Sequence, residues 1–265
     1  MLVDLFPLCL EFISPQMKFF QEILLSLYRI YAIILFIILM ILFLPFMLIA
    51  ALFGIYVGGN IIFFLIRMWA RLWYFFCGLR HEVKGKIPKQ GTSFIYVANH
   101  DSYLDAPVTM LTLRGQFRAL GKEEMRRIPL FGWIYRYGVI LVDRSDKENR
   151  AKSVRVLKRV LEKKISIMIF PEGTFNYTEN AMNKFYDGAF RIAIESQTPI
   201  VPVVFHGVKN ILPRDSFFKL TPGKSTAVYL DKVAVNGLAT DDIPMLRDKV
   251  YSMMENEILR EKEEG

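Results

Sequence analysis

One histidine and one aspartate in this sequence are spaced in a way that suits acid–base chemistry. His100 comes just after the apolar run 94–97, and Asp105 follows five positions later. An imidazole has an unperturbed pKa of roughly 6.5, so it can serve as a base near neutral pH, and a carboxylate beside it can fix its tautomer and stabilise the imidazolium. A turn that opens a helix would bring Asp105 back to His100. The spacing alone also fits a structural alternative, a capping histidine followed by an aspartate at a helix N-terminus.

Other residues that could bind or activate a substrate come after other short apolar segments of the chain. They are Lys122, Arg144 and the loop residues Glu172, Gly173 and Thr174. In an α/β domain, side chains at the ends of neighbouring strands gather at one edge of the sheet. Acyl transfer from a thioester to an alcohol requires a base near the hydroxyl, cations for a phosphate and donors for the tetrahedral oxyanion. The sequence offers groups for such a transfer, although the cations also fit solvated strand ends and the loop also fits an ordinary turn.

Four blocks of sequence stand in a fixed order across residues 80–205. They are Val97–Asp105, Gly121–Met125 with Pro129–Trp133 and Arg144, Ile169–Thr174, and Pro199–Val203. In this order and at these intervals they resemble the glycerolipid acyltransferase family, whose familiar members acylate 1-acylglycerol 3-phosphate. The coincidence of four ordered blocks is far more specific than any single block.

The resemblance implies a mechanism without a protein nucleophile. His100 would deprotonate the acceptor hydroxyl, with Asp105 orienting it, and the hydroxyl would attack the thioester directly. Ser102 lies close enough in sequence to suggest a serine hydrolase, but the chain has no G-x-S-x-G elbow. The implied co-substrate is a thioester of acyl carrier protein or coenzyme A, and no other cofactor is expected.

The resemblance also implies which residues hold the acceptor, a lysophospholipid. Lys122 and Arg144 match the family positions for the acceptor head group, and two cations suit a phosphate. In the third block, Glu172 would brace a cation or an acceptor hydroxyl. Gly173 would permit close approach of the backbone, and Thr174 completes the block.

Two positions depart from the family pattern and leave the acceptor open. Phe175 stands where the best-known members have an arginine after the E-G-T triplet, so a phosphate-binding charge is absent there. In the later block 184–188 the basic residue, Lys184, comes earlier than usual. Either Lys184 supplies the charge from a shifted position or the acceptor differs. The alternatives to 1-acylglycerol 3-phosphate are a lysophospholipid with a larger head group and a lyso form of an amino-acid lipid.

Composition places the chain at a membrane. Of its 265 residues, 53% are hydrophobic, and the mean hydropathy is +0.28. The net charge of +8 favours anionic partners. Beside so apolar a segment these are membrane lipids rather than nucleic acid, for which the chain has no recognition motif. Cys9 and Cys77 are too few for a disulfide scaffold, and the three histidines lack the spacing of metal ligands, so no metal is expected.

An uncharged run covers residues 30–66. As one helix it would be about 55 Å long, against a hydrocarbon core of roughly 30 Å, so it must bend. Pro45 can kink it, and the glycines and asparagine within 54–60 are the expected break. The first piece, 30–53, is expected to cross the membrane. The second piece, 61–79, is expected to lie at the membrane surface or to re-enter it shallowly, because it carries interfacial anchors, namely Arg67, Trp69, Arg71, Trp73 and Tyr74.

Cations crowd the C-terminal side of the uncharged run, whereas only Lys18 and Arg29 precede it. The positive-inside bias then predicts a protein of the cytoplasmic (inner) membrane whose catalytic domain faces the cytoplasm. A cleaved signal peptide is a poor alternative, because the run is too long and no cleavage site with a basic flank precedes it. The first 16 residues are interrupted by charges and prolines, which makes Met17 an alternative start to Met1.

The rest of the chain alternates short apolar strands with helices. Strands are expected at 81–87, 93–98, 117–121, 139–142, 165–170, 200–205 and 225–230, and helices at 103–113, 123–137, 147–164, 189–195 and from 242 onward. Because 165–170 is wholly apolar, we expect it to be a central strand buried on both faces. The predicted fold class is α/β, a mostly parallel twisted sheet flanked by helices. No repeat or linker divides it, so the expected organisation is membrane-anchoring helices at 1–80 and one acyltransferase catalytic domain at 81–265.

Two histidines and one rival function remain. His81 is expected to be exposed. His206 ends a strand and is expected to be a hydrogen-bonded structural histidine, with a place in the cleft as the alternative. The rival to an acyltransferase is a non-catalytic lipid-binding scaffold built on the same fold, which would have no need to keep His100 and Asp105.

Overall fold

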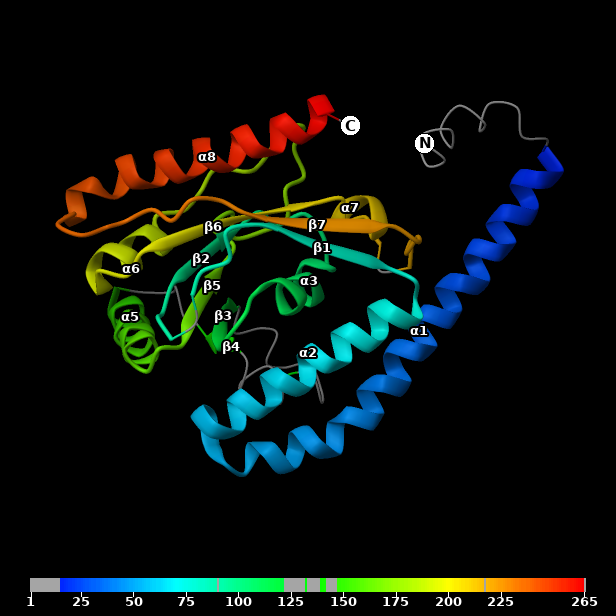
Figure 1. Cartoon of the computed structure of the whole chain (residues 1–265), viewed down its shortest axis with the longest axis horizontal. Helices are drawn as coiled ribbons and strands as arrows, with labels where there is room; N and C mark the ends of the chain where they lie inside the picture. Colours follow the sequence, from blue (N-terminus) through cyan, green and yellow to red (C-terminus); the bar gives the residue numbers. More distant parts are fainter. Residues whose placement is uncertain are drawn as a thin grey trace.

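The computed structural model describes residues 15–89, 91–121, 132, 139–141, 147–216 and 218–264. Within these residues, seven strands form one sheet in the order β1-β7-β6-β2-β5-β3-β4 (Figure 1). The strands are β1 (Arg80–Gly85), β2 (Ile95–Ala98), β3 (Phe117–Gly121), β4 (Val139–Leu141), β5 (Ser166–Ile169), β6 (Ile200–His206) and β7 (Lys224–Tyr229).

Most of the sheet is parallel, as predicted. The five neighbouring strands from β6 to β4 share one direction. β7 is antiparallel to β6, and β1 lies parallel to β7 at the edge, so the last two strands are reversed. The predicted central strand is confirmed, because β5 lies between β2 and β3 and all four of its residues are buried. In β2, likewise, alternate residues enter the cores on the two opposite faces of the sheet.

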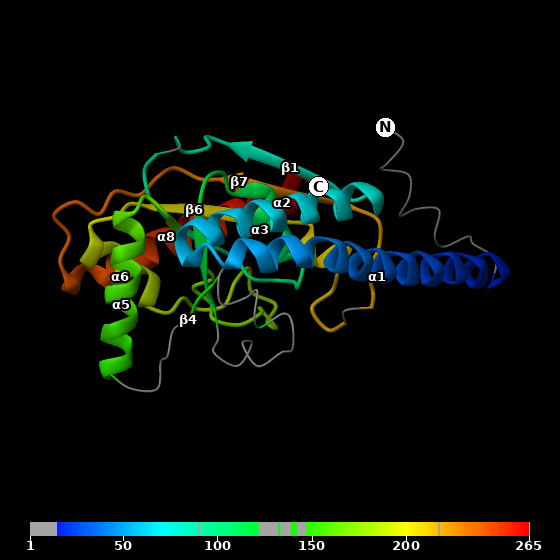
Figure 2. The same cartoon turned by 90° about the horizontal axis from the view of Figure 1, so that it is seen from below.

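Helices cover both faces of the sheet (Figures 1 and 2). One face packs against α5 (Lys147–Glu162), α6 (Gly188–Ser196) and α8 (Ile243–Glu264), which begins after the short 3₁₀ turn η4 (Thr240–Asp242). The opposite face packs against α1 (Pro15–Ala51), α2 (Gly59–Phe76), α3 (Asp105–Thr112) and α7 (Val208–Ile211). Because α1 and α2 share a core with the strands, the N-terminal helices are part of the packing of the sheet.

The N-terminal helices form a hairpin whose turn is a π-helix, η2 (Gly54–Gly58). Gly54 has a φ of +77°, and a Cβ on Gly58 would lie 2.1 Å from the Ala50 carbonyl oxygen, so this turn requires glycine at both positions. The predicted break is confirmed, and Pro45 lies inside α1. Among the described residues, Gln16–Ala51 is the one helix long and apolar enough to cross a membrane, and it contains an 18-residue window with a mean hydropathy of 3.2.

Four of the five expected interfacial anchors on α2 instead make contacts within the protein. Tyr74 is 3% exposed, and its ring meets Trp73. Trp73 donates its indole N–H to the Ala32 carbonyl of α1 at 3.0 Å, and Trp69 and Trp73 both meet Phe36 edge-on. Arg67 donates to three backbone carbonyls at the end of α3 and just beyond, those of Met110, Leu113 and Gly115. The prediction is wrong for these side chains. Side chains with an apolar body and a polar end can pack on a neighbouring helix as well as on lipid, and the sequence pattern is the same in both cases.

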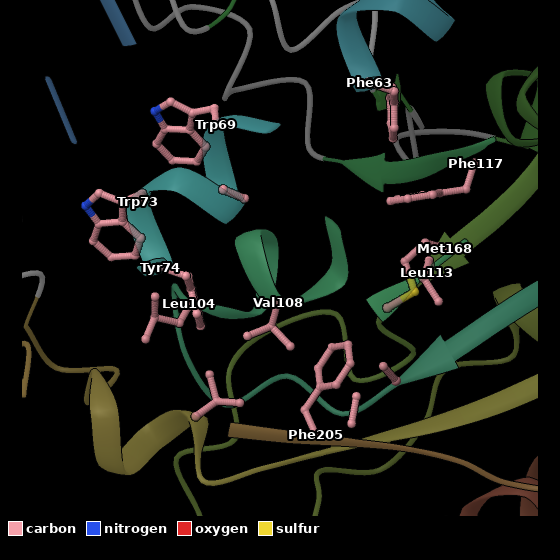
Figure 3. Close-up of a cluster of buried hydrophobic side chains, with 14 of the residues drawn as sticks. Phe63, Trp69, Trp73, Tyr74, Leu104, Val108, Leu113, Phe117, Met168 and Phe205 are labelled. Atoms are coloured by element: carbon pink, nitrogen blue, oxygen red, sulfur yellow. The ribbon is translucent and has the colours of Figure 1, made fainter. Parts of the chain in front are cut away.

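Phe63 joins the helical hairpin to the sheet (Figure 3). Its ring is 1% exposed, meets Phe117 of β3 edge-on at 4.8 Å and lies against the Arg118 guanidinium. We expect Phe63→Ala to lower the free energy of unfolding by about 3–5 kcal/mol, the usual cost of removing a buried aromatic ring. Chemical unfolding in detergent measures this loss. The adjacent Phe64, with a side chain 56% exposed, is the control, and equal losses for Phe63→Ala and Phe64→Ala would contradict the assigned contact.

His81 is largely enclosed, so the expectation that it is exposed is wrong. Its Nδ1 lies 2.9 Å from the Ser225 hydroxyl of β7, and its Nε2 lies 2.9 Å from the Thr112 hydroxyl of α3. Burial lowers the pKa of the His81 imidazole from 6.5 to about 4. The ring is enclosed because β1 pairs with β7 while α3 packs beside it, and these contacts join residues far apart in sequence.

The low pKa of His81 predicts a loss of stability in acid. Native His81 stays neutral while unfolded His81 binds a proton, so the protein loses stability as pH falls from 6.5 to about 4. His81→Gln removes this titration. The stability of the wild type relative to His81→Gln should therefore fall by up to about 3 kcal/mol between neutral pH and about pH 4. Unfolding both proteins at both pH values measures this change, and a difference independent of pH would contradict a buried neutral imidazole.

Candidate active site

Two neighbouring parallel strands deliver the central residues of the candidate site. β2 and β5 pair with Val97 opposite Ile169, so the segments that follow them emerge side by side. The backbone N–H of His100 donates to Glu172 Oε1 at 2.8 Å, and the N–H of Asn176 donates to the His100 carbonyl at 3.0 Å. The structure thus brings the first and third sequence blocks together, as the strand-end argument predicted.

Asn99 fixes the start of the His100 turn, and sequence reasoning missed it. Its side chain is 1% exposed. Its Oδ1 accepts the Phe205 N–H at 2.7 Å, and its Nδ2 donates to the Phe205 carbonyl at 3.0 Å. The turn is therefore attached to β6 by a bidentate contact. The available signal was a polar residue directly after a wholly apolar strand, because such a residue must find partners when it is buried.

His100 and Asp105 form a close pair. Nδ1 of His100 lies 2.7 Å from Oδ2 of Asp105, and the same oxygen accepts the backbone N–H groups of Asp101 at 2.8 Å and Ser102 at 2.9 Å. An ionised carboxylate only accepts hydrogen bonds, so Nδ1 carries the proton and Nε2 is the basic nitrogen. The helix α3 begins at Asp105, which is the turn geometry expected from the sequence.

Asp105 is fully buried while His100 remains accessible. The Asp105 side chain is 1% exposed and that of His100 is 24% exposed. Burial raises the pKa of the Asp105 carboxyl, and the contacts with His100 and the Ser102 amide act in the opposite direction. These contacts favour the ionised form, so Asp105 can hold the imidazole and stabilise the imidazolium without itself meeting a substrate.

Ser102 has a structural place in the turn. Its hydroxyl is buried and donates to the Leu212 carbonyl at 2.6 Å, while it accepts the N–H of Leu104 at 3.1 Å. A hydroxyl used in this way is not presented to a substrate. Ser102 is therefore not placed to act as a nucleophile beside the His100–Asp105 pair.

Aromatic rings hold the imidazole on two sides. Phe170 stacks on His100 with 4.1 Å between ring centroids and 16° between planes, and Phe175 meets His100 edge-on at 4.3 Å. Phe175 in turn contacts Tyr103 at 4.7 Å. The residue that departs from the family pattern thus packs directly on the imidazole. It restricts the ring and makes this wall of the site apolar.

Glu172 connects the two loops of the site. Its Oε1 accepts the His100 N–H at 2.8 Å and its Oε2 accepts the Asn183 N–H at 2.7 Å. Burial raises the pKa of the Glu172 carboxyl to about 7, although the two amide contacts lower it. Within the described part of the chain, no lysine or arginine forms an ion pair with Glu172. Its contacts there hold the backbone N–H groups of His100 and Asn183 in place. Next to it, Gly173 takes a φ of +70°, and Thr174 is exposed.

The chain is similar to acyltransferases in sequence and in fold. The sequence profile of the Acyltransferase family matches residues 80–206. The 1-acyl-sn-glycerol-3-phosphate acyltransferase of Haemophilus influenzae is 32% identical over 206 residues, which cover 75% of this chain and 82% of that relative. The chain belongs to the glycerolipid acyltransferase family. The resemblance of the four sequence blocks is thereby confirmed.

Other members of the family extend the comparison. The 1-acyl-sn-glycerol-3-phosphate acyltransferase alpha of Mus musculus is 31% identical over 183 residues, and this chain spans 63% of its length. The crystal structure of the LPA acyltransferase PlsC from Thermotoga maritima matches with a TM-score of 0.73 at 23% identity, covering 93% of this chain and 98% of that chain. The fold is therefore shared with PlsC over almost the whole chain.

The two cations that the family pattern assigns to the acceptor head group, Lys122 and Arg144, lie outside the described residues. The strands before them are described, and Gly121 at the end of β3 pairs with Leu141 at the end of β4. The head-group roles of Lys122 and Arg144 stay predictions.

His206 lies at the end of β6 and pairs with α8. Its Nε2 is 3.6 Å from the Glu257 carboxylate, and its Nδ1 contacts Glu261. The expected structural histidine is confirmed, and His206 serves the docking of α8. In the described ranges, no group of three histidines, cysteines or carboxylates is placed to hold a metal ion.

Proposed function

We propose that this protein transfers a fatty acyl group from acyl carrier protein or coenzyme A to the sn-2 hydroxyl of 1-acylglycerol 3-phosphate. The product is phosphatidate, an intermediate of phospholipid biosynthesis. The carrying observation is the 2.7 Å contact between His100 Nδ1 and a buried Asp105, which leaves Nε2 as a base on an accessible side chain. The choice of acceptor is supported by the names of the relatives in Haemophilus influenzae and Mus musculus.

The proposed reaction is a direct transfer. Nε2 of His100 takes the proton of the sn-2 hydroxyl while the hydroxyl oxygen bonds to the carbonyl carbon of the thioester. The tetrahedral intermediate then collapses, the carbon–sulfur bond breaks, and the leaving thiolate takes the proton back from the imidazolium. Asp105 stabilises the imidazolium in between. Glu172 acts as a positioning residue, because it holds the His100 backbone N–H.

Membrane attachment follows from the same proposal. The acceptor is a lipid with one acyl chain, which the membrane supplies. The candidate membrane helix α1 would hold the protein at that membrane. The donor is a water-soluble thioester, so the domain at 81–265 works from the cytoplasmic side, with residues 1–80 as the anchor. The excess of lysine and arginine after the uncharged run supports that orientation.

A second acceptor class is favoured by one observation. Phe175 packs on His100 where a cation would suit a phosphate, which supports a lysophospholipid with a larger head group or a lyso amino-acid lipid. The mechanism at His100 is the same for each acceptor.

An acceptor screen tests the proposal. Purified full-length protein is given palmitoyl-coenzyme A or palmitoyl-acyl carrier protein, and free thiol is measured with each lysolipid in turn. We expect thiol release that depends on 1-acylglycerol 3-phosphate and equals the phosphatidate formed. Release with another lysolipid alone would replace the acceptor and keep the mechanism. No release with any lysolipid and either donor would favour the non-catalytic scaffold.

A further inference from the structure

The wall of the site beside His100 is a row of aromatic rings that ends in a cation. Phe175 meets the His100 ring at 4.3 Å, and the Phe175 and Tyr177 centroids are 6.5 Å apart. The guanidinium carbon of Arg214 lies 5.1 Å from the centroid of the Tyr177 ring. Arg214 is thus the outermost member of a row that begins at the proposed base, although it comes from a segment outside the four sequence blocks.

The loop of Arg214 lies between the site and the candidate membrane helix. Leu212, two positions before Arg214, accepts the Ser102 hydroxyl at 2.6 Å and so docks the loop on the His100 turn. At the other end of this loop, Arg29 of α1 donates to the Leu220 carbonyl at 3.4 Å. The loop therefore contacts both the His100 turn and the candidate membrane helix.

The Arg214 side chain is half-buried against the Tyr177 ring. Within the described residues, no carboxylate lies within ion-pair distance of it, and the adjacent Asp215 pairs with Lys219 at 2.8 Å. The Tyr177 ring against which it lies is 63% exposed, so the contact holds the guanidinium at the surface of the site. A planar guanidinium over an aromatic ring keeps its hydrogen-bond donors free at the edge, in the geometry that matches a phosphate.

We infer that Arg214 binds the phosphate of the acceptor head group while His100 receives the proton of the acceptor hydroxyl. An extended glycerol 3-phosphate with a hydrogen bond at each end spans on the order of 10 Å, so the inference requires the row, with steps of 4.3, 6.5 and 5.1 Å, to bend between His100 and Arg214. Arg214 then supplies a charge that Phe175 lacks, from a different loop. The inference rests on the proposed function, because it requires an acceptor that carries a phosphate.

Arg214→Gln tests this assignment in the full-length protein. The KM for 1-acylglycerol 3-phosphate should rise about 10- to 100-fold, the cost of losing a charge-assisted hydrogen bond, and the KM for the acyl donor should not change. Arg214→Lys should recover part of the loss, because it keeps the charge without the planar fork. The matched control is Arg191→Gln on the exposed surface of α6, on the other face of the sheet, which should leave both KM values unchanged.

Each other outcome has a distinct meaning. An unchanged KM for 1-acylglycerol 3-phosphate in Arg214→Gln would overturn the inference and leave the proposed function intact. A rise in the KM for the donor alone would also overturn it, since the bound phosphate would then belong to the donor. Monoacylglycerol, which lacks the phosphate, distinguishes the loss of a phosphate contact from a loss of folded protein. The residual rate of monoacylglycerol acylation should be the same in the wild type and in Arg214→Gln. Failure of the wild type to acylate any lysolipid would instead remove the proposed function.

Discussion

Replacing His100 with alanine is expected to lower the kcat of acyl transfer by about 100- to 10,000-fold, the contribution of a general base. The imidazole is fixed by the 2.7 Å contact with Asp105 and by the rings of Phe170 and Phe175, yet 24% of its side chain is exposed to a substrate. The Ser102 hydroxyl donates to the Leu212 carbonyl and, as a neutral hydroxyl, is too weak a base to replace the imidazole. The protein should remain folded and membrane-bound.

Thiol release from a palmitoyl donor measures this loss, with membrane binding and the unfolding temperature as checks on folding. His100→Gln separates the base from the hydrogen bond, because glutamine can donate to Asp105 but cannot take the proton. It should be as inactive as His100→Ala. His81→Gln is the matched control, a histidine-to-glutamine change away from the candidate site, and it should keep the wild-type kcat near neutral pH. A wild-type kcat in His100→Ala would remove the base assignment.

Replacing Asp105 with asparagine is expected to lower kcat by at least about 100-fold, because the imidazolium loses its counter-charge at the moment it forms. Asparagine fits the site. Its amide oxygen can take the place of Oδ2, which accepts the backbone N–H groups of Asp101 and Ser102. Its NH₂ then occupies the position of Oδ1, a buried atom without a hydrogen-bond partner among the described residues. The change therefore removes charge with little change of shape.

The separate effects on kcat and on KM distinguish a positioning residue from a binding residue. Asp105 is fully buried and does not reach the substrate, so the KM values for acceptor and donor should stay within about twofold of wild type while kcat falls. Steady-state kinetics with each substrate varied in turn measures the split. A kcat close to that of the wild type would mean that Asp105 is only a charge at the N-terminus of α3.

The sequence was sufficient for the parts of the fold that depend on local pattern. The wholly apolar run at 165–170 predicted a central strand because only a strand buried on both faces has no polar side, and β5 is that strand. The expected strand 117–121 coincides with β3. The contact of His100 with Asp105 was foreseen because it spans five residues and one helix start.

Local sequence pattern did not predict contacts between side chains and partners that are distant in sequence. Arg67 was expected at the membrane surface, yet it bonds to carbonyls more than 40 positions away. His81 was expected in solvent and is enclosed by Thr112 and Ser225. Periodicity shows which face of an element is apolar but not whether lipid or protein covers that face.

The walls of the candidate site show the same limit. Phe175 was recognised as a departure in sequence, but its packing on the imidazole depends on how the 170–176 loop returns to the end of β2. Arg214 comes from the segment between α7 and β7, about 110 residues beyond His100, and no motif connects the two. Its proximity to the row of rings follows from the contact between Ser102 and Leu212.

The central claim is that His100 drives acyl transfer onto a lysolipid hydroxyl. Its most direct measurement is the conversion of labelled 1-acylglycerol 3-phosphate with palmitoyl donor, wild type beside His100→Ala, with the lipid products separated and counted. The account predicts labelled phosphatidate from the wild type and a rate lower by about 100-fold or more from His100→Ala. Phosphatidate formed at equal rates by the two proteins would contradict it.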